Sequence, residues 1–188
     1  MGHYSALVFT TQNIDEKMER FYFDYEFGRE FNEEMDVEEA KREFERIINN
    51  PENFRNDLNK FLKYKKEGYA SYFEEECGHT IDEYGSVGYT SNPDGFYDWY
   101  EVGGRWNNEL PLKDGTMVND APVDLVDIDK LIEAQNIFCA IDIYDEYEHF
   151  PNSKKEYKKQ MKQLFEIVKG WQELNGEQVQ VWLIDYHS

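Results

Sequence analysis

The sequence predicts an α+β fold, specifically a ferredoxin-like sandwich in which an antiparallel or mixed sheet carries helices on one face. Three observations support this prediction: β-rich segments stand at both termini, amphipathic helical segments lie between them, and the chain ends in a strand–helix–strand order. A chain of 188 residues is long enough for one domain that buries roughly 70% of its unfolded surface. We therefore expect a single domain over residues 1–188, with a helical hairpin at 36–66 as an insertion.

The first elements are a predicted strand and two predicted helices. The β-forming run His3–Thr10 opens the fold as a strand, and the crowded aromatic side chains of residues 14–27 indicate a buried helix. Asp36 and Glu39 have the types and spacing of a capping box, in which each satisfies a backbone N–H at the start of a helix. A helix over 36–49 follows from this pair.

Asn50 and Pro51 are typical of the N-cap and the first position of a helix, so a further helix is predicted over 51–66. From residue 67 to about 112 glycines and the turn Asn92-Pro93-Asp94-Gly95 interrupt the pattern. Short strands are expected near 86–90 and 96–102. In the remaining sequence, helices are predicted at 123–135 and 153–171, and strands at 136–144 and 178–187.

Acidic residues dominate the charge, because 40 Asp and Glu against 20 Lys and Arg give a formal net charge of −20. This surplus disfavours direct binding to nucleic acid or to anionic membranes and favours a basic protein partner, including one that itself binds nucleic acid. The alternative is that the acidity serves solubility alone. Residues 74–109 hold nine acids and one base. The carboxylates expected to contact a partner are Glu74, Glu75, Glu76, Asp82, Glu83, Asp98 and Glu101.

Localisation is predicted from segments that the sequence lacks. No apolar run approaches the roughly 18 residues of a membrane helix, and no secretory signal pattern is present. Cys77 and Cys139 lie in dissimilar surroundings, which favours free thiols in a reducing compartment over a disulfide. A cytoplasmic protein is expected.

The common catalytic patterns are missing from the sequence. There is no glycine-rich phosphate-binding loop, no Gly-x-Ser-x-Gly turn and no His-Glu-x-x-His pair. Cys77 and His79 form one pair of soft ligands, but no second pair follows at zinc spacing. No metal or other cofactor is predicted, and a non-enzymatic role is favoured.

Residues 94–110 are the most informative stretch, with the sequence Asp-Gly-Phe-Tyr-Asp-Trp-Tyr-Glu-Val-Gly-Gly-Arg-Trp-Asn-Asn-Glu-Leu. Arg105 is its only base. The favoured interpretation is a structural ion pair with a nearby acid, namely Asp98, Glu101 or Glu109. The alternative is that the guanidinium holds a ligand carboxylate or phosphate beside Trp99 or Trp106. The glycine pair would let the backbone pass close to such a ligand, or supply positive φ at a bulge.

Asp185 and His187 lie two residues apart on the last predicted strand and so share a face. Asp185 could orient the imidazole as a general base, although a surface pair at a fraying terminus is the favoured interpretation. His3 would approach His187 only if the two terminal strands were neighbours. A ligand pocket built from these features would use Tyr97, Trp99, Arg105, Trp106, Asp185 and His187.

The segment from Asn92 to Trp106 resembles a sequence motif found in uncharacterised proteins of bacteriophages and bacteria. There, Trp-Asp-Trp-Tyr-x-x-Gly-Gly-Arg-Trp is followed near the C-terminus by a strand that ends Val-Asp-Cys-His-Ile. In this chain Tyr97 replaces the first tryptophan and Tyr186 replaces the cysteine, which argues against thiol chemistry at that position. The resemblance covers about the C-terminal half and implies a phage or mobile-element setting, with no activity attached.

Two functions from different classes follow. The leading hypothesis is a non-enzymatic, acidic protein that binds and inhibits a host protein, such as a nucleic-acid-binding defence effector, in the manner of an anti-CRISPR or a nucleic-acid mimic. The alternative is a small-molecule or nucleotide-binding protein, sequestering or enzymatic, that uses the aromatic and arginine residues of 94–110. A third possibility is an assembly module in which this block only packs the core.

Overall fold

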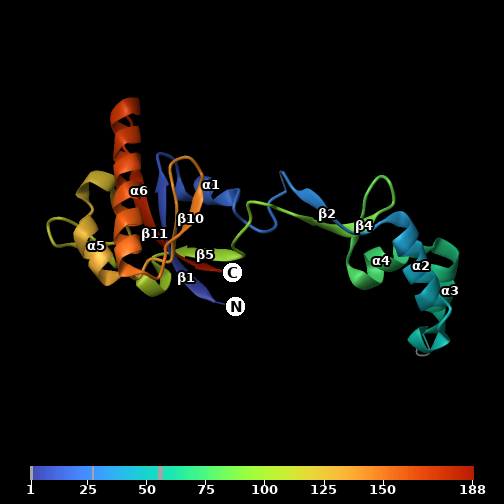
Figure 1. The fold of residues 1–188 in the computed structure, drawn as a ribbon. Coiled ribbons are helices and arrows are strands. Elements are labelled where there is room, and N and C mark those ends of the chain that lie inside the picture. The colour runs from blue at the N-terminus through green and yellow to red at the C-terminus, as the bar shows by residue number, and fades with distance from the viewer. Residues whose placement is uncertain (1, 27, 55–56) are drawn as a thin grey trace. The chain divides into compact units, whose positions relative to one another are not determined.

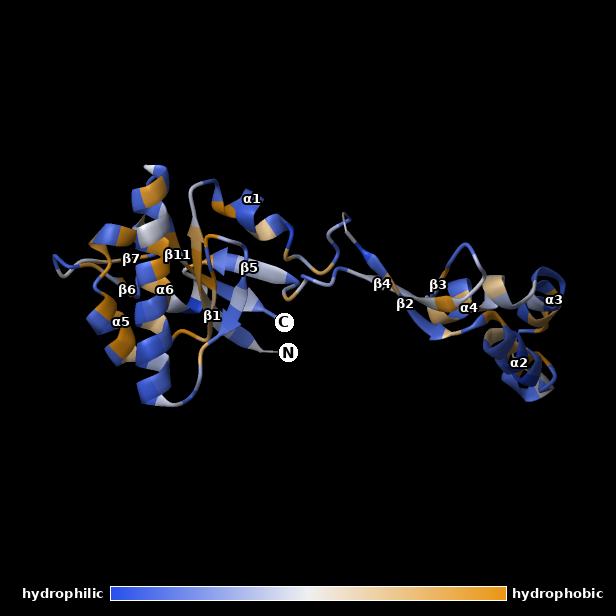
Figure 2. Cartoon of the chain, turned by 45° about the horizontal axis from the view of Figure 1, so that its top comes forward, coloured by the Kyte–Doolittle hydropathy of each residue, from blue (hydrophilic) through white to orange (hydrophobic). Residues whose placement is uncertain are grey.

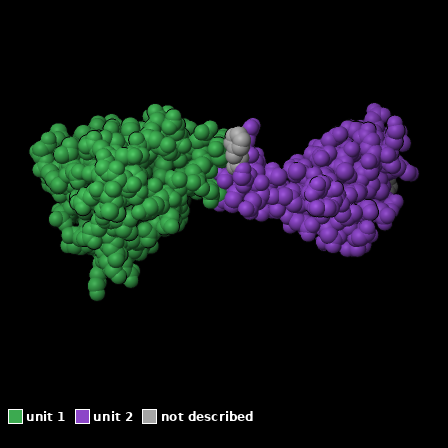
Figure 3. Space-filling view, turned by 90° about the horizontal axis from the view of Figure 1, so that it is seen from above, with its two compact units in different colours: residues 1–25, 94–188 green, residues 26–93 purple. Residues whose placement is uncertain are grey.

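The computed structural model describes residues 2–26, 28–54 and 57–188. The chain divides into two compact units (Figures 1 and 3). Unit 1 combines Met1–Tyr25 with Asp94–Ser188, and unit 2 is Glu26–Pro93. The helices expected at 36–66 lie in this second unit, which is inserted into the sequence of the first.

Unit 1 is built on a mixed sheet with the strand order β10-β9-β1-β11-β5, and β8 also pairs with β11. The strands of this sheet are β1 (His3–Thr10), β5 (Trp99–Val102), β8 (Asp120–Pro122), β9 (Cys139–Ile141), β10 (Tyr147–His149) and β11 (Gln180–His187). A separate hairpin joins β6 (Leu110–Pro111) to β7 (Met117–Val118). The predicted α+β class and mixed sheet are confirmed.

The ferredoxin-like arrangement is not confirmed. In that fold a split βαβ unit places another strand between its two parallel strands. Here β1 and β9 are parallel and directly adjacent, while β11 pairs antiparallel with β1 over its full length. The two terminal strands are therefore neighbours, and His3 lies opposite His187.

Helices cover both faces of the sheet, so the prediction of helices on one face is wrong. Leu7 and Phe9 pack with α5 (Ile128–Ala134) and α6 (Lys154–Asn175). The alternate side chains of β1 face the opposite way and pack with α1 (Ile14–Glu19). Figure 1 shows α5 and α6 on one side of the sheet and α1 on the other. The strand has apolar residues on both faces, as expected of a central strand.

Several elements begin and end where their capping residues predict. The Asp36 side chain accepts a hydrogen bond from the Glu39 N–H at 2.8 Å, which confirms the predicted start of α2 (Val37–Ile48). Helix α6 ends at Gly176, which has a left-handed backbone that satisfies a terminal carbonyl. Its apolar stripe alternates with charged residues along the helix (Figure 2). The helix predicted at 14–27 is shorter, and that at 123–135 is split into a 3₁₀ turn (Val123–Leu125) and α5.

Unit 2 pairs a small sheet with helices. Its strand order is β2-β4-β3, from β2 (Glu30–Met35), β3 (Thr80–Ile81) and β4 (Val87–Ser91). The helices that follow α2 are a 3₁₀ turn (Pro51–Phe54), α3 (Leu58–Glu67) and α4 (Tyr69–Cys77). A small core of Ala40, Phe73 and Val87 holds these elements together. The helix predicted over 51–66 is thus two elements, with residues 55–56 outside the described part.

Two sequence expectations can be compared directly with the structure. In the described ranges, no helix has both the length and the apolar character needed to cross a bilayer. Cys77 and Cys139 are both free thiols, as predicted, the first exposed and the second buried.

Candidate functional site

The aromatic block and the C-terminal tail, which are far apart in sequence, form adjacent strands. Strand β5 pairs antiparallel with β11, so Trp99 lies opposite His187 and Glu101 lies opposite Asp185. Strand β1 lies on the other side of β11. Because residues opposite one another or two apart share a face, His3, Trp99, Asp185 and His187 project from the same face of the sheet.

Asp185 is the buried centre of this group, with 1% of its surface exposed. Its Oδ1 lies 2.9 Å from His3 Nδ1, and its Oδ2 accepts a hydrogen bond of 3.1 Å from the Arg105 backbone N–H. A buried carboxylate needs such partners, because an unpaired charge away from water is costly. The Asp185 side chain therefore fixes both the His3 ring and the turn that contains Arg105.

The glycine pair explains how the backbone reaches Asp185. Gly103 and Gly104 have φ angles of +75° and +48°, in the left-handed region that glycine adopts without strain. A Cβ on Gly104 would lie 2.4 Å from the Asp185 Cβ, which leaves no room for a side chain. The glycine pair within 94–110 thus lets the backbone pack closely against Asp185, the carboxylate that holds His3.

A second histidine–aspartate pair stands beside the first. His187 Nδ1 lies 2.6 Å from Asp98 Oδ1. The His3 and His187 rings have centroids 5.5 Å apart, and His3 also contacts the Trp99 ring edge-on at 6.0 Å. In the described residues, each ring uses Nδ1 for its carboxylate partner and keeps Nε2 for another partner.

A pocket of about 260 Å³ opens beside His3. Aromatic, amide and other uncharged side chains accompany His3 in its lining, and none is Asp, Glu, Lys or Arg. The twelve lining residues are His3, Tyr4, Ser5, Trp106, Gln135, Asn136, Ile137, Phe138, Phe150, Pro151, Asn152 and Tyr157. The pocket combines flat apolar surfaces with a few polar atoms, as ligand sites commonly do.

Two of its polar atoms have no hydrogen-bond partner. Within the described ranges, four buried side-chain N or O atoms are unsatisfied, and Tyr157 Oη and Asn136 Oδ1 are two of them. Tyr157 is 2% exposed. Burial raises the pKa of its hydroxyl to about 12, moderated by the nearby Ile137 amide, which does not reach normal hydrogen-bond geometry. A buried polar group without a partner costs about 1–3 kcal/mol, and both atoms belong to residues that line the pocket.

The Arg105 side chain does not form the expected ion pair. It is exposed, and no ion pair links it to any acid in the described part of the chain. Asp98 pairs with His187 instead. The structure therefore uses the Arg105 backbone and leaves its guanidinium available.

The other residues predicted for a ligand pocket divide between the two faces of the sheet. Trp106 lines the pocket. Tyr97 is buried on the opposite face, where its hydroxyl donates to the Met18 carbonyl at 2.9 Å. His3, Ser5, Asn136 and Tyr157 are not among the predicted pocket residues, because the pairing of β1 with β9 and β11 and the packing of α6 bring them together. The sequence offered one indication of this arrangement, namely that His3 would lie near His187 if the two terminal strands were neighbours.

The carboxylates predicted to contact a partner are likewise spread over both units. Glu75 and Glu76 pair with Lys63 and Lys60 inside unit 2, while Asp82 accepts backbone hydrogen bonds within a turn. Asp98 and Glu101 belong to unit 1. Three members are exposed and form no side-chain hydrogen bond or ion pair in the described residues, namely Glu74, Glu83 and Glu101.

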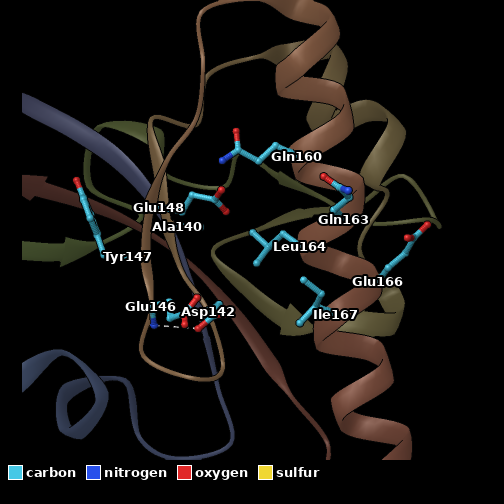
Figure 4. A pocket seen from close by; sticks show the side chains of 10 residues that line it. All are labelled: Ala140, Asp142, Glu146, Tyr147, Glu148, Gln160, Gln163, Leu164, Glu166 and Ile167. Carbon is cyan, nitrogen blue, oxygen red and sulfur yellow. Dashed lines mark hydrogen bonds between the residues drawn. The ribbon is translucent and has the colours of Figure 1, made fainter.

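A larger cavity of about 750 Å³ lies between the β9–β10 hairpin and α6 (Figure 4). Its acidic lining residues are Asp142, Glu146, Glu148 and Glu166. Asp142 Oδ1 accepts the Glu146 N–H at 2.9 Å and so shapes the hairpin turn. None of the buried, unsatisfied polar atoms lies in this lining. In the described residues no group of three His, Cys, Asp or Glu side chains is placed to hold a metal ion.

Comparison with known proteins found no matching family model, no matching curated protein and no matching solved structure.

Proposed function

We propose that unit 1 binds a small planar molecule with a neutral or anionic polar group, of the nucleotide class, in the pocket beside His3. The observation that carries this proposal is the lining itself. The lining contains no carboxylate. It does contain two buried polar atoms without a hydrogen-bond partner, and an imidazole that Asp185 holds in place.

The absence of acids from the lining is informative in a chain of this composition. About one residue in five is Asp or Glu, so a lining of twelve residues would hold two or three by chance. Their absence favours a neutral or anionic ligand over a cation. The net charge of −20 repels long polyanions, so a small ligand fits better than a nucleic acid strand.

The size and shape of the pocket restrict the ligand further. A volume near 260 Å³ lies just below the roughly 300–1,000 Å³ of typical ligand pockets, which suits one aromatic ring system rather than a large ligand. Trp106 and Phe138 supply flat surfaces for stacking. A phosphate attached to the ring system would extend toward solvent. Arg105 precedes the lining residue Trp106 and has an exposed side chain, so it is the candidate for bidentate binding of that phosphate.

Calorimetry and thermal shift with nucleoside monophosphates and free nucleobases test the proposal. Ligand at about 100 times Kd is expected to stabilise the protein by roughly 2.7 kcal/mol. Tyr157→Phe should weaken binding about tenfold, because one hydrogen bond worth about 1.4 kcal/mol is lost. Tyr144→Phe, at an exposed tyrosine outside the pocket, is the matched control and should bind normally.

The proposal is overturned if no nucleotide or base binds at millimolar concentration. It is also overturned if Tyr157→Phe and Trp106→Ala both bind with the affinity of the unaltered protein. Retention of binding in Tyr157→Phe alone would place the ligand elsewhere in the pocket, so Trp106→Ala decides that case.

The acidic inhibitor of a host protein remains a second proposal. The observation that favours it is that the Glu74 and Glu83 side chains are exposed and form no hydrogen bond or ion pair in the described part of unit 2. The double variant Glu74→Lys, Glu83→Lys should then lose salt-sensitive association with a basic partner captured from bacterial lysate. Unchanged capture would remove these two residues from the proposal.

A further inference from the structure

We infer that His3 and His187 form a general acid–base pair that cleaves a phosphodiester bond in a small nucleotide. This inference rests on the proposed function, because it makes the bound nucleotide a substrate. It goes beyond binding because it assigns a reaction to a pair of residues.

The geometry of the two rings carries the inference. They lie directly opposite each other on neighbouring strands, with centroids 5.5 Å apart. Each Nδ1 is held by its own carboxylate, Asp185 for His3 and Asp98 for His187. Both free Nε2 atoms therefore belong to rings whose orientation is fixed, as acid–base catalysis requires.

Two adjacent imidazoles divide the roles of acid and base. Because the two rings lie side by side, one imidazole can accept a proton while the other donates one. The charged groups that face the rings are Asp185, Asp98 and, opposite Asp185 on β5, Glu101.

The step balances without an oxidant or reductant. The neutral imidazole takes a proton from water as the water oxygen forms a bond to phosphorus. The bond from phosphorus to the leaving oxygen breaks, and the protonated imidazole gives that oxygen its proton. The products are a phosphomonoester and an alcohol, and proton exchange with solvent restores the pair.

Nearby residues support this step as positioning residues. The Arg105 N–H donates to Asp185, and its guanidinium, which forms no ion pair in the described part of the chain, is available for the phosphoryl oxygens. Trp99 is 45% exposed and contacts His3. It lies outside the pocket lining, so it provides a stacking surface for a second base. Asp185 and Asp98 fix the ring orientations and do not touch the substrate.

The test measures hydrolysis of bis(4-nitrophenyl) phosphate, 2′,3′-cyclic nucleotides and a 3′,5′-linked dinucleotide by the full chain. We expect turnover with a bell-shaped dependence of kcat/KM on pH. His3→Gln and His187→Gln should each lower kcat at least about 100-fold with little change in KM. The double variant should lose little more, because the two residues act as a unit. His149→Gln, at an exposed histidine outside the pair, is the control.

The outcomes separate the inference from the proposed function. Nucleotide binding without turnover of any probe between pH 4 and 9 overturns the inference and leaves the binding proposal standing. Turnover that survives in both histidine variants overturns the assignment of the pair. If His3→Gln fails to fold, His187→Gln and Asp98→Asn still test the inference. A purely structural role for Asp98 would lower the thermal stability of Asp98→Asn without changing the pH profile of hydrolysis. The absence of both binding and turnover overturns both proposals.

Discussion

Asp185 shows at the residue scale how one buried side chain organises several distant parts of the chain. Its two oxygens hold a histidine from the first strand and a backbone amide from the Gly-Gly-Arg turn. The sequence suggested that an Asp at this place could orient an imidazole. It did not show that His3 would be the imidazole, because the spacing of Asp185 and His187 draws attention to residues on one strand, whereas the contact crosses to another.

Arg105 illustrates a second limit of sequence reasoning. Its acidic surroundings favour a side-chain ion pair, but the nearby acid Asp98 is engaged by His187. The glycine pair instead brings the Arg105 N–H to Asp185. The sequence shows which charges lie near Arg105 along the chain. The backbone turn determines that its N–H, rather than its side chain, reaches the Asp185 carboxylate.

Gly104→Ala should destabilise unit 1 by more than the strain of a left-handed backbone, which costs about 1–2 kcal/mol at a residue with a Cβ. The added methyl would meet Asp185 at 2.4 Å. Gly176→Ala is the control, because it has a positive φ of +70° but nothing within 4 Å. Denaturant unfolding of both variants measures the difference. Equal losses would show that the contact with Asp185 costs nothing.

The two thiols should differ sharply in reactivity. Burial raises the pKa of Cys139 to about 11, so roughly one thousandth of it is thiolate at pH 8, and its burial blocks access. Cys77 is exposed, although partial burial raises its pKa as well. A colorimetric thiol reagent at pH 8 should titrate one thiol in the native protein and two in denaturant. Two fast-reacting thiols in the native protein would contradict the burial of Cys139.

At the scale of elements, local patterns predict which segments become strands and helices better than they predict the sheet order. The apolar runs that became β1 and β11 and the stripe that became α6 are long, and each is confirmed. The strand β2, with the sequence Glu-Phe-Asn-Glu-Glu-Met, has no alternating apolar pattern, so it was missed. The parallel pairing of β9 with β1 joins segments that are far apart in the sequence, so the local pattern of β9 does not predict it.

Two ion pairs that weaken in acid link α3 to α4. Hydrogen bonds from Lys60 and Lys63 lower the pKa of Glu76 and Glu75 respectively. A carboxylate whose pKa is lowered by folding stabilises the fold above its unfolded pKa, near 4.3 for Glu. That stabilisation is lost as pH falls through the lower, folded value.

Hydrogen exchange on the full chain should therefore show α3 and α4 losing protection below about pH 4, before the strands of unit 1. The double variant Glu75→Lys, Glu76→Lys should lose that protection at neutral pH, because it places like charges against Lys60 and Lys63. Glu74→Lys is the control, because Glu74 is exposed on the same helix and its side chain forms no hydrogen bond or ion pair in the described residues. Unchanged protection in the double variant would show that these pairs contribute nothing to unit 2.

At the scale of the whole molecule, the division into two units separates the candidate site from the inserted segment. The pocket, both histidines and their two aspartates all belong to unit 1. The sequence predicted an insertion at 36–66 from helix signals, and the inserted unit extends to Glu26–Pro93 because β2, α4, β3 and β4 pack with those helices. The sequences of these flanking elements have weak helix and strand patterns, so only the helical part of the insertion was predicted.

The chain leaves and re-enters unit 1 at neighbouring points, since the Phe23 N–H donates to the Tyr97 carbonyl at 2.9 Å. Replacing Glu26–Pro93 with a short Gly/Ser linker of about six residues should therefore leave the sheet of unit 1 intact, because such a linker spans roughly 12–15 Å. We expect two-state thermal unfolding and nucleotide affinity within about threefold of the full chain. A scrambled linker of equal length is the control for linker sequence. A folded product that no longer binds the nucleotides bound by the full chain would show that unit 2 contributes to the ligand site, and the assignment of that site to unit 1 alone would be wrong.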